Sequence, residues 1–181
     1  MQEARMLPTD ENQKTYHNFQ PSVATKKLTT RLAFALGSLY LITLVHHIYG
    51  GLADGIQARL MVPLIMAAPL LVTLGLIYLY RQSESRTVLL LFSIVAILAF
   101  VILLGIVHSG YSHAYKDILY LLDGPSDWYY RLNLDEHYPP DDLFFEITGV
   151  LEIIPSYFIA LFTWQLIRTR HNDQQNPEQV H

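Results

Sequence analysis

Five ionisable side chains lie inside, or at the ends of, the long apolar segments of this chain. They are His46, His47, His108, Glu146 and Glu152. An ionisable group in the hydrocarbon of a membrane costs about 3 kcal/mol or more, so such residues usually mark a functional site. Imidazole nitrogens and carboxylate oxygens are donors that Zn²⁺ and Fe²⁺ accept in proteins. These residue types therefore indicate a metal site, provided that the fold brings them together.

The candidate metal ligands come from three different segments. The expected ligands are His47, His108, His113 and Glu152. This set suits Zn or Fe better than soft Cu(I), because it contains no sulfur donor. Glu152 and Glu146 are also the candidates for catalysis, since a carboxylate can take a proton from a water that a metal ion activates. The chemistry expected at such a site is either hydrolysis or oxygen chemistry at iron. The apolar segments contain no Glu-x-x-His pair, the pattern of di-iron bundles, which favours a single divalent ion.

Two alternatives to this metal site remain open. A b-type haem could be held between His46 or His47 on the first helix and His108 on the third, at similar depth, with Gly105 leaving room for the ring. The protein could also be a non-enzymatic transporter or partner subunit whose histidines and glutamates exchange protons. No motif identifies a substrate. A cavity near the outer lipid headgroups would suit a lipid or another amphipathic ligand.

The composition indicates that membrane helices position these side chains. Hydrophobic residues make up 51% of the 181 residues, charged residues only 15%, and the mean hydropathy is +0.24. The apolar segments cover about residues 32–49, 60–80, 87–107 and 143–167. At about 1.5 Å per residue each can cross a hydrocarbon core of about 30 Å, and backbone groups in lipid must be paired within the segment. The predicted fold is an all-α bundle of four transmembrane helices.

The distribution of cations predicts the orientation of the bundle. Most of them flank the same ends of the segments: Lys26, Lys27, Arg31, Arg81, Arg86, Arg168 and Arg170. The positive-inside rule then places both termini in the cytoplasm and the long loop 109–142 outside. We therefore expect a multi-pass protein of the cell membrane, which is the inner membrane in a Gram-negative bacterium. Its membrane domain spans residues 28–170, between polar tails at 1–27 and 171–181 that lack an apolar core.

Composition also excludes two classes of site. The formal net charge is −4 and no basic run is interleaved with aromatic residues, so the chain has no electrostatic footprint for nucleic acid. It has no cysteine, which excludes disulfides, thiolate metal ligands and thiol nucleophiles.

Helical spacing predicts which side chains face the inside of the bundle. The first and fourth segments carry polar stripes formed by Tyr40, Thr43 and His47 and by Thr148, Glu152 and Ser156. Residues three, four and seven apart share a helical face, so both stripes are expected to face inward. A purely structural hydrogen bond between His47 and Glu152 is the alternative to a ligand site. For His46 we favour a side chain that reaches into the headgroup region.

Local signals refine the two candidate ligand helices. His108 and His113 are five residues apart and would not share a face of an α-helix. Gly110 could end that helix and fold His113 back toward His108. Pro155 removes a backbone donor, which predicts a kink beside Glu152.

The long loop carries aromatic and acidic residues. Trp128, Tyr129 and Tyr130 are typical of a membrane interface and predict either a lid over the bundle or an aromatic belt with no gating role. Asp141 and Asp142 are expected to cap the fourth helix, where a helix N-terminus favours negative charge.

Overall fold

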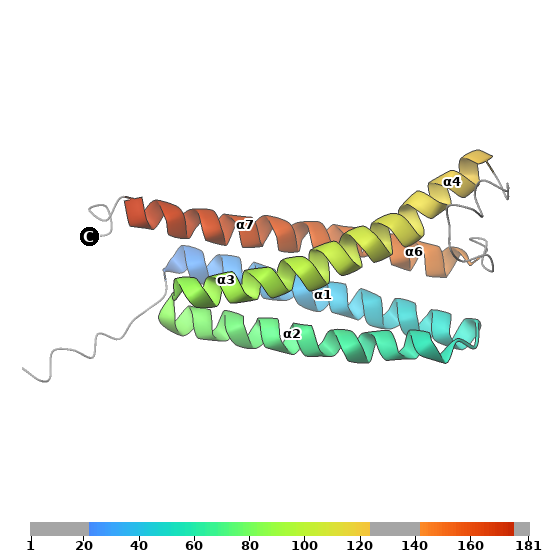
Figure 1. Ribbon diagram of the computed structural model, residues 1–181, viewed down its shortest axis with the longest axis horizontal. Helices are drawn as coiled ribbons and strands as arrows, with labels where there is room; N and C mark the ends of the chain where they lie inside the picture. Colours follow the sequence, from blue (N-terminus) through green and yellow to red (C-terminus); the bar gives the residue numbers. More distant parts are fainter. Residues whose placement is uncertain (1–21, 124–141, 176–181) are drawn as a thin grey trace, which may run out of the picture.

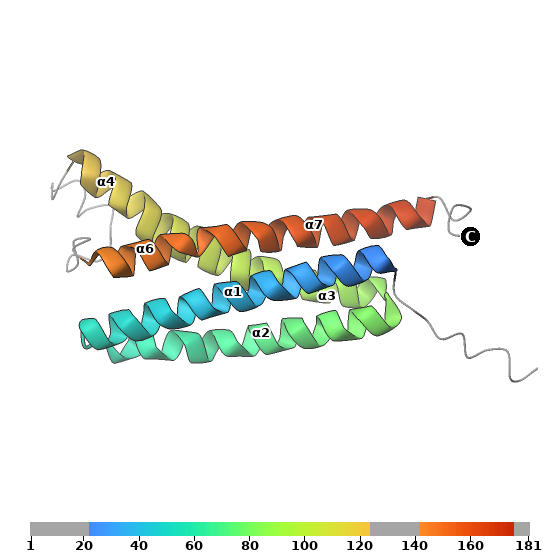
Figure 2. The same cartoon turned by 180° about the vertical axis from the view of Figure 1, so that it is seen from behind.

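The computed structural model describes residues 22–123 and 142–175, and every regular element within them is a helix. The elements are α1 (Val23–Ala53), α2 (Gln57–Ser83), α3 (Arg86–Val95), the π-helix η2 (Ala96–Tyr115), α4 (Lys116–Asp123), α6 (Leu143–Leu151) and α7 (Ile153–Gln175). These elements form four rods, each antiparallel to the next one along the chain (Figure 1). The first two rods are α1 and α2; the third rod consists of α3, η2 and α4 in succession, and the fourth rod consists of α6 and α7. α4 diverges from the bundle at the end where α6 begins (Figure 2).

All four rods are long and apolar enough to cross a membrane. The candidate spans are Val23–Ala53, Gln57–Ser83, Arg86–Leu122 and Leu143–Asn172. Large apolar side chains such as Phe34, Leu71 and Trp164 are exposed on the outside of the bundle, which suits contact with lipid. The predicted all-α class with four such helices is confirmed.

The helices extend further than the hydropathy pattern predicts. α1 begins at Val23, inside the predicted tail, because the Ser22 side chain accepts a hydrogen bond from the Thr25 N–H and caps it. α7 continues to Gln175, beyond the predicted end of the membrane domain. The third rod does not stop near residue 107, since its helical hydrogen bonding passes through Gly110 and ends at Asp123. Hydropathy reports the part that lies in lipid, and a helix can continue into water.

The bundle has an apolar core, and most of its buried ionisable side chains gather at one end, whereas Thr25 and Thr29 are buried hydroxyls at the other end. The apolar core includes Leu32, Leu36, Leu39, Phe92, Phe100, Ile159 and Leu166, all at most 1% exposed. Toward the end where α6 begins, the buried side chains become polar: Thr43, His46, His47, Ser109, His113, Thr148 and Glu152. The predicted inward orientation of the two polar stripes is confirmed for Thr43, His47, Thr148, Glu152 and Ser156.

The cap of the fourth rod agrees with the sequence at Asp142. Its carboxylate accepts hydrogen bonds of 3.0 Å from the backbone N–H groups of Phe144 and Phe145. The N–H of Phe145 and the Tyr49 hydroxyl hold the pKa of this carboxyl below its ordinary value. The polar tail before residue 22, the aromatic loop residues Trp128–Tyr130, Asp141 and the chain after residue 175 lie outside the described residues.

Candidate metal centre

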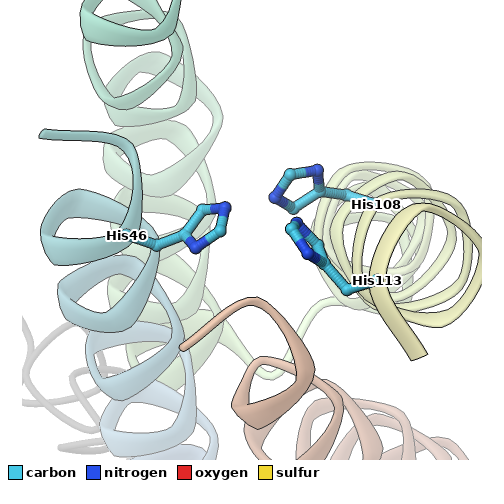
Figure 3. Close-up of side chains that lie close together, drawn as sticks. All are labelled: His46, His108 and His113. Atoms are coloured by element: carbon cyan, nitrogen blue, oxygen red, sulfur yellow. The ribbon is translucent and has the colours of Figure 1, made fainter. Parts of the chain in front are cut away.

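Three histidines converge at the polar end of the bundle. His46 comes from α1, and His108 and His113 come from η2; their rings point into one shared space (Figure 3). One ligand nitrogen from each lies within 4.8 Å of the other two. A metal ion bound at about 2.0–2.1 Å to each nitrogen requires separations below about 4 Å. Small side-chain rotations therefore suffice to close this group around an ion.

The π-helical backbone brings His108 and His113 together. Along an α-helix, residues five apart differ in direction by about 140°. In π-helical turns the N–H of residue i+5 bonds the carbonyl of residue i, so residues five apart point in more similar directions. The two ring centroids are 5.0 Å apart. The expectation that these residues do not share a face is therefore wrong, and Gly110 does not end the helix.

His46 is oriented by the fourth rod. Its Nδ1 lies 3.1 Å from the Phe145 carbonyl oxygen and 3.0 Å from the Thr148 hydroxyl. A carbonyl oxygen only accepts hydrogen bonds, so Nδ1–H is the donor and the lone pair of the neutral ring is on Nε2. Nε2 is buried and has no hydrogen-bond partner among the described residues. A second hydrogen bond that fixes the ring in this way is typical of metal-binding histidines.

His113 has the corresponding arrangement with a carboxylate. Its Nδ1 lies 2.6 Å from Oε2 of Glu146, in the first turn of α6. An ionised Glu146 accepts the Nδ1–H bond, which leaves Nε2 of His113 with its lone pair. A carboxylate–histidine pair makes the imidazole a stronger metal ligand and fixes its tautomer.

His47 and Glu152 lie beside the converging group. The His47 ring stacks on His108 with centroids 4.9 Å apart, and both of its nitrogens are buried without a hydrogen-bond partner in the described chain. Glu152 is 0% exposed; its Oε2 lies 3.9 Å from Nε2 of His108 and 3.3 Å from the Ser109 hydroxyl oxygen. Its Oε1 has no partner among the described residues. Both side chains keep unsatisfied donor or acceptor atoms next to the three histidines.

The position of Glu152 follows from a break in the fourth rod. α6 ends at Leu151 and α7 begins at Ile153, so the break falls at Glu152, three residues before Pro155. The interruption lies at the position where the sequence predicts a kink, although the backbone angles of Glu152 remain those of a right-handed helix, with φ −61° and ψ −22°. The hydroxyl of Ser109 donates a 2.7 Å hydrogen bond to the Gly149 carbonyl at the break, which ties η2 to this point.

His46 is the residue that sequence reasoning misjudged. It was expected to reach the headgroups, but it is 0% exposed and belongs to the converging group. A headgroup position would leave the ring in contact with water. His46 lies three residues after Thr43, beside the stripe that contains His47, so a wider inward face would have included it.

Comparisons with known proteins add no functional information to this geometry. No protein family, curated protein or solved structure matches the chain significantly.

A cavity gives access to the histidines. It has a volume of about 210 Å³ and reaches His47, His108 and His113 from the end of the bundle where α1 ends. Its other walls include the basic side chains Arg59 and Lys116. The Arg59 guanidinium stacks over the Phe145 ring at 4.6 Å and pairs with Asp54. Water or a small polar group can therefore enter beside the candidate ligands.

Replacing Glu146 by Gln tests whether this carboxylate supports a metal ligand. We expect Glu146→Gln to weaken metal binding by about 10–100-fold, because the amide has no charge to stabilise the His113 N–H. Zn²⁺ titration of the purified protein with a competing chelator measures the affinity. Glu84→Gln, at the opposite end of the bundle, is the matched control and should leave the affinity unchanged. Equal affinities for the two variants would contradict this role.

Proposed function

We propose that this protein is a membrane metalloprotein that binds one divalent ion, Zn²⁺ or Fe²⁺, through His46, His108 and His113. The convergence of three ligand nitrogens within 4.8 Å carries the proposal. The hydrogen bonds that Nδ1 of His46 and Nδ1 of His113 make support the proposal, since they leave the lone pair of each neutral ring on Nε2, where it can bind a metal ion. Three imidazoles leave a coordination position open, the arrangement typical of catalytic rather than structural zinc.

The chemistry we propose is hydrolysis by an activated water. A divalent ion with an open position lowers the pKa of a bound water to about 7. Glu152, with one oxygen unpartnered and the other 3.9 Å from His108, is the group best situated to accept a proton from that water. Glu146 acts through His113, so we assign it a positioning role in place of the catalytic role expected from the sequence.

The haem alternative has less support. The rings of His46 and His108 are 5.2 Å apart with planes at 72°, and the His113 ring lies within 5.0 Å of both. The centroid of the His47 ring also lies 4.9 Å from the ring centroids of His46 and of His108. A macrocycle between two axial ligands needs the space that these rings occupy. A metal ion fits among them without displacing a ring.

A protonatable cluster without metal, in a transporter or partner subunit, is the remaining alternative. The unsatisfied nitrogens of His47 are compatible with it. Metal content separates the two functions. After growth with Zn²⁺ or Fe²⁺ and purification without chelators, we expect about one ion per chain. Protein that contains no stoichiometric ion under either condition would rule out the metalloprotein.

The membrane orientation is also part of the proposal. We place both termini in the cytoplasm and the histidine cluster at the outer face of the cell membrane, since most cations flank the other end of the bundle. A cavity at that depth favours a lipid or another amphipathic substrate. A reporter that is active only after export should stay inactive when fused after Arg170 and become active when fused at Asp54. The reverse pattern would invert the orientation.

A further inference from the structure

A second cavity lies between the start of α3 and the last turns of α7. Figure 1 shows these helix ends at the opposite end of the bundle from α6. Its volume is about 270 Å³, and its walls are Arg86, Leu89, Leu90, Ile167, Arg170 and His171. Two arginines and a histidine therefore surround one hollow whose remaining walls are aliphatic. The proposed metal chemistry uses none of these residues.

The charge in this cavity is incompletely balanced. Nε of Arg170 is buried and has no hydrogen-bond partner among the described residues. Among the described residues, the carboxylate that pairs with Arg170 is that of Glu84, with a long separation of 3.9 Å from Nη1 to Oε2. The other oxygen of Glu84 accepts a 3.1 Å hydrogen bond from the Ser22 N–H. Arg86 is exposed and makes no ion pair within the described part of the chain. The hollow is thus a cationic site with buried donor capacity.

The position of these groups matches the depth of lipid headgroups. Arg86 is the first residue of the third candidate span, and Arg170 lies close to the end of the fourth. Guanidinium groups bind phosphate through paired N–H donors. Leu89, which is only 3% exposed, with Leu90 and Ile167 offers an apolar surface to the part of a lipid next to its phosphate.

We propose that this cavity binds the headgroup phosphate of an anionic phospholipid from the adjacent leaflet. Basic hollows between transmembrane helices bind anionic headgroups in this way. Inorganic phosphate carries the same kind of charge as the lipid headgroup but has no apolar part that could contact the aliphatic side chains of the cavity. The site therefore selects a phospholipid over the free anion, and an anionic phospholipid over a zwitterionic one.

Lipid retention by the full chain tests the proposal. The protein is purified in neutral detergent and titrated with phosphatidylglycerol, phosphatidylcholine or inorganic phosphate, and bound lipid is counted by native mass spectrometry. We expect preferential binding of phosphatidylglycerol and a loss of affinity of about tenfold or more in the Arg86→Gln, Arg170→Gln double variant. Arg168→Gln is the matched control, because Arg168 is exposed on the same helix and does not line the cavity.

Three results would overturn this inference. They are equal binding of phosphatidylcholine, the same affinity in the double variant as in Arg168→Gln, and displacement of the lipid by millimolar inorganic phosphate. Circular dichroism and gel filtration verify that the variants are folded. If the double variant does not fold, Arg86→Gln alone replaces it, because that side chain is exposed and its substitution leaves the packing intact. Metal content is measured in parallel and should not change.

Discussion

Replacing His46, His108 or His113 by Ala is expected to reduce the bound metal from about one ion per chain to nearly none. Each substitution removes one of three converging nitrogens, and two imidazoles hold a divalent ion much more weakly than three. Elemental analysis of the purified variants measures the loss. His171→Ala is the matched control, because His171 lies at the opposite end of the bundle and should retain the full metal content.

The same series distinguishes this ligand set from the one expected from the sequence. His47 stacks on His108 but does not belong to the converging group, so His47→Ala should keep most of its metal. Loss of metal in His47→Ala with full retention in His46→Ala would contradict the assignment of His46. Equal retention in all four variants would contradict the site as a whole.

Gly149→Ala is expected to damage the site without touching a ligand. A Cβ at position 149 would lie 2.5 Å from Cγ and from Cδ2 of His113, closer than any carbon atoms pack. Overpacking of this kind costs about 1–3 kcal/mol of stability. The displaced ring should also lose metal affinity, by about the 10–100-fold typical of removing a supporting contact.

Gly37→Ala is the control for this substitution. It is also a helical glycine, but a Cβ there meets nothing within 4 Å. We expect it to raise stability slightly, since Ala is favoured over Gly inside a helix by about 0.5–1 kcal/mol. Thermal unfolding in detergent and Zn²⁺ titration give both readouts. If Gly149→Ala and Gly37→Ala behave alike, then His113 is not held by this contact.

The sequence predicts the fold because hydropathy and length alone define membrane helices. It does not predict the helix ends, since Ser22 and the residues after Ile167 are polar, and hydropathy does not report whether a polar segment is helical. It also does not predict η2. π-helical hydrogen bonding leaves no residue pattern in this segment, and helical periodicity assumes the α-helical turn.

The candidate site is predicted in part. Polar stripes identify His47, Glu152, Thr43, Thr148 and Ser156 as buried, because helical spacing alone determines which residues share a face, whereas Tyr40 of the same stripe is half-buried. The hydrogen bond from His46 to the Phe145 carbonyl joins residues 99 positions apart and becomes visible only when α1 packs against α6. The same holds for the contact of His113 with Glu146, on which the positioning role that we propose for this glutamate rests.

X-ray absorption at the metal edge of the Zn²⁺-loaded protein tests the central claim most directly. The account predicts three imidazole nitrogens at about 2.0–2.1 Å and one oxygen at a similar distance. The spectrum should lose one imidazole contribution in any His46→Ala protein that still binds Zn²⁺. A spectrum that contains only oxygen ligands, or an intact protein that retains no ion to measure, would contradict it.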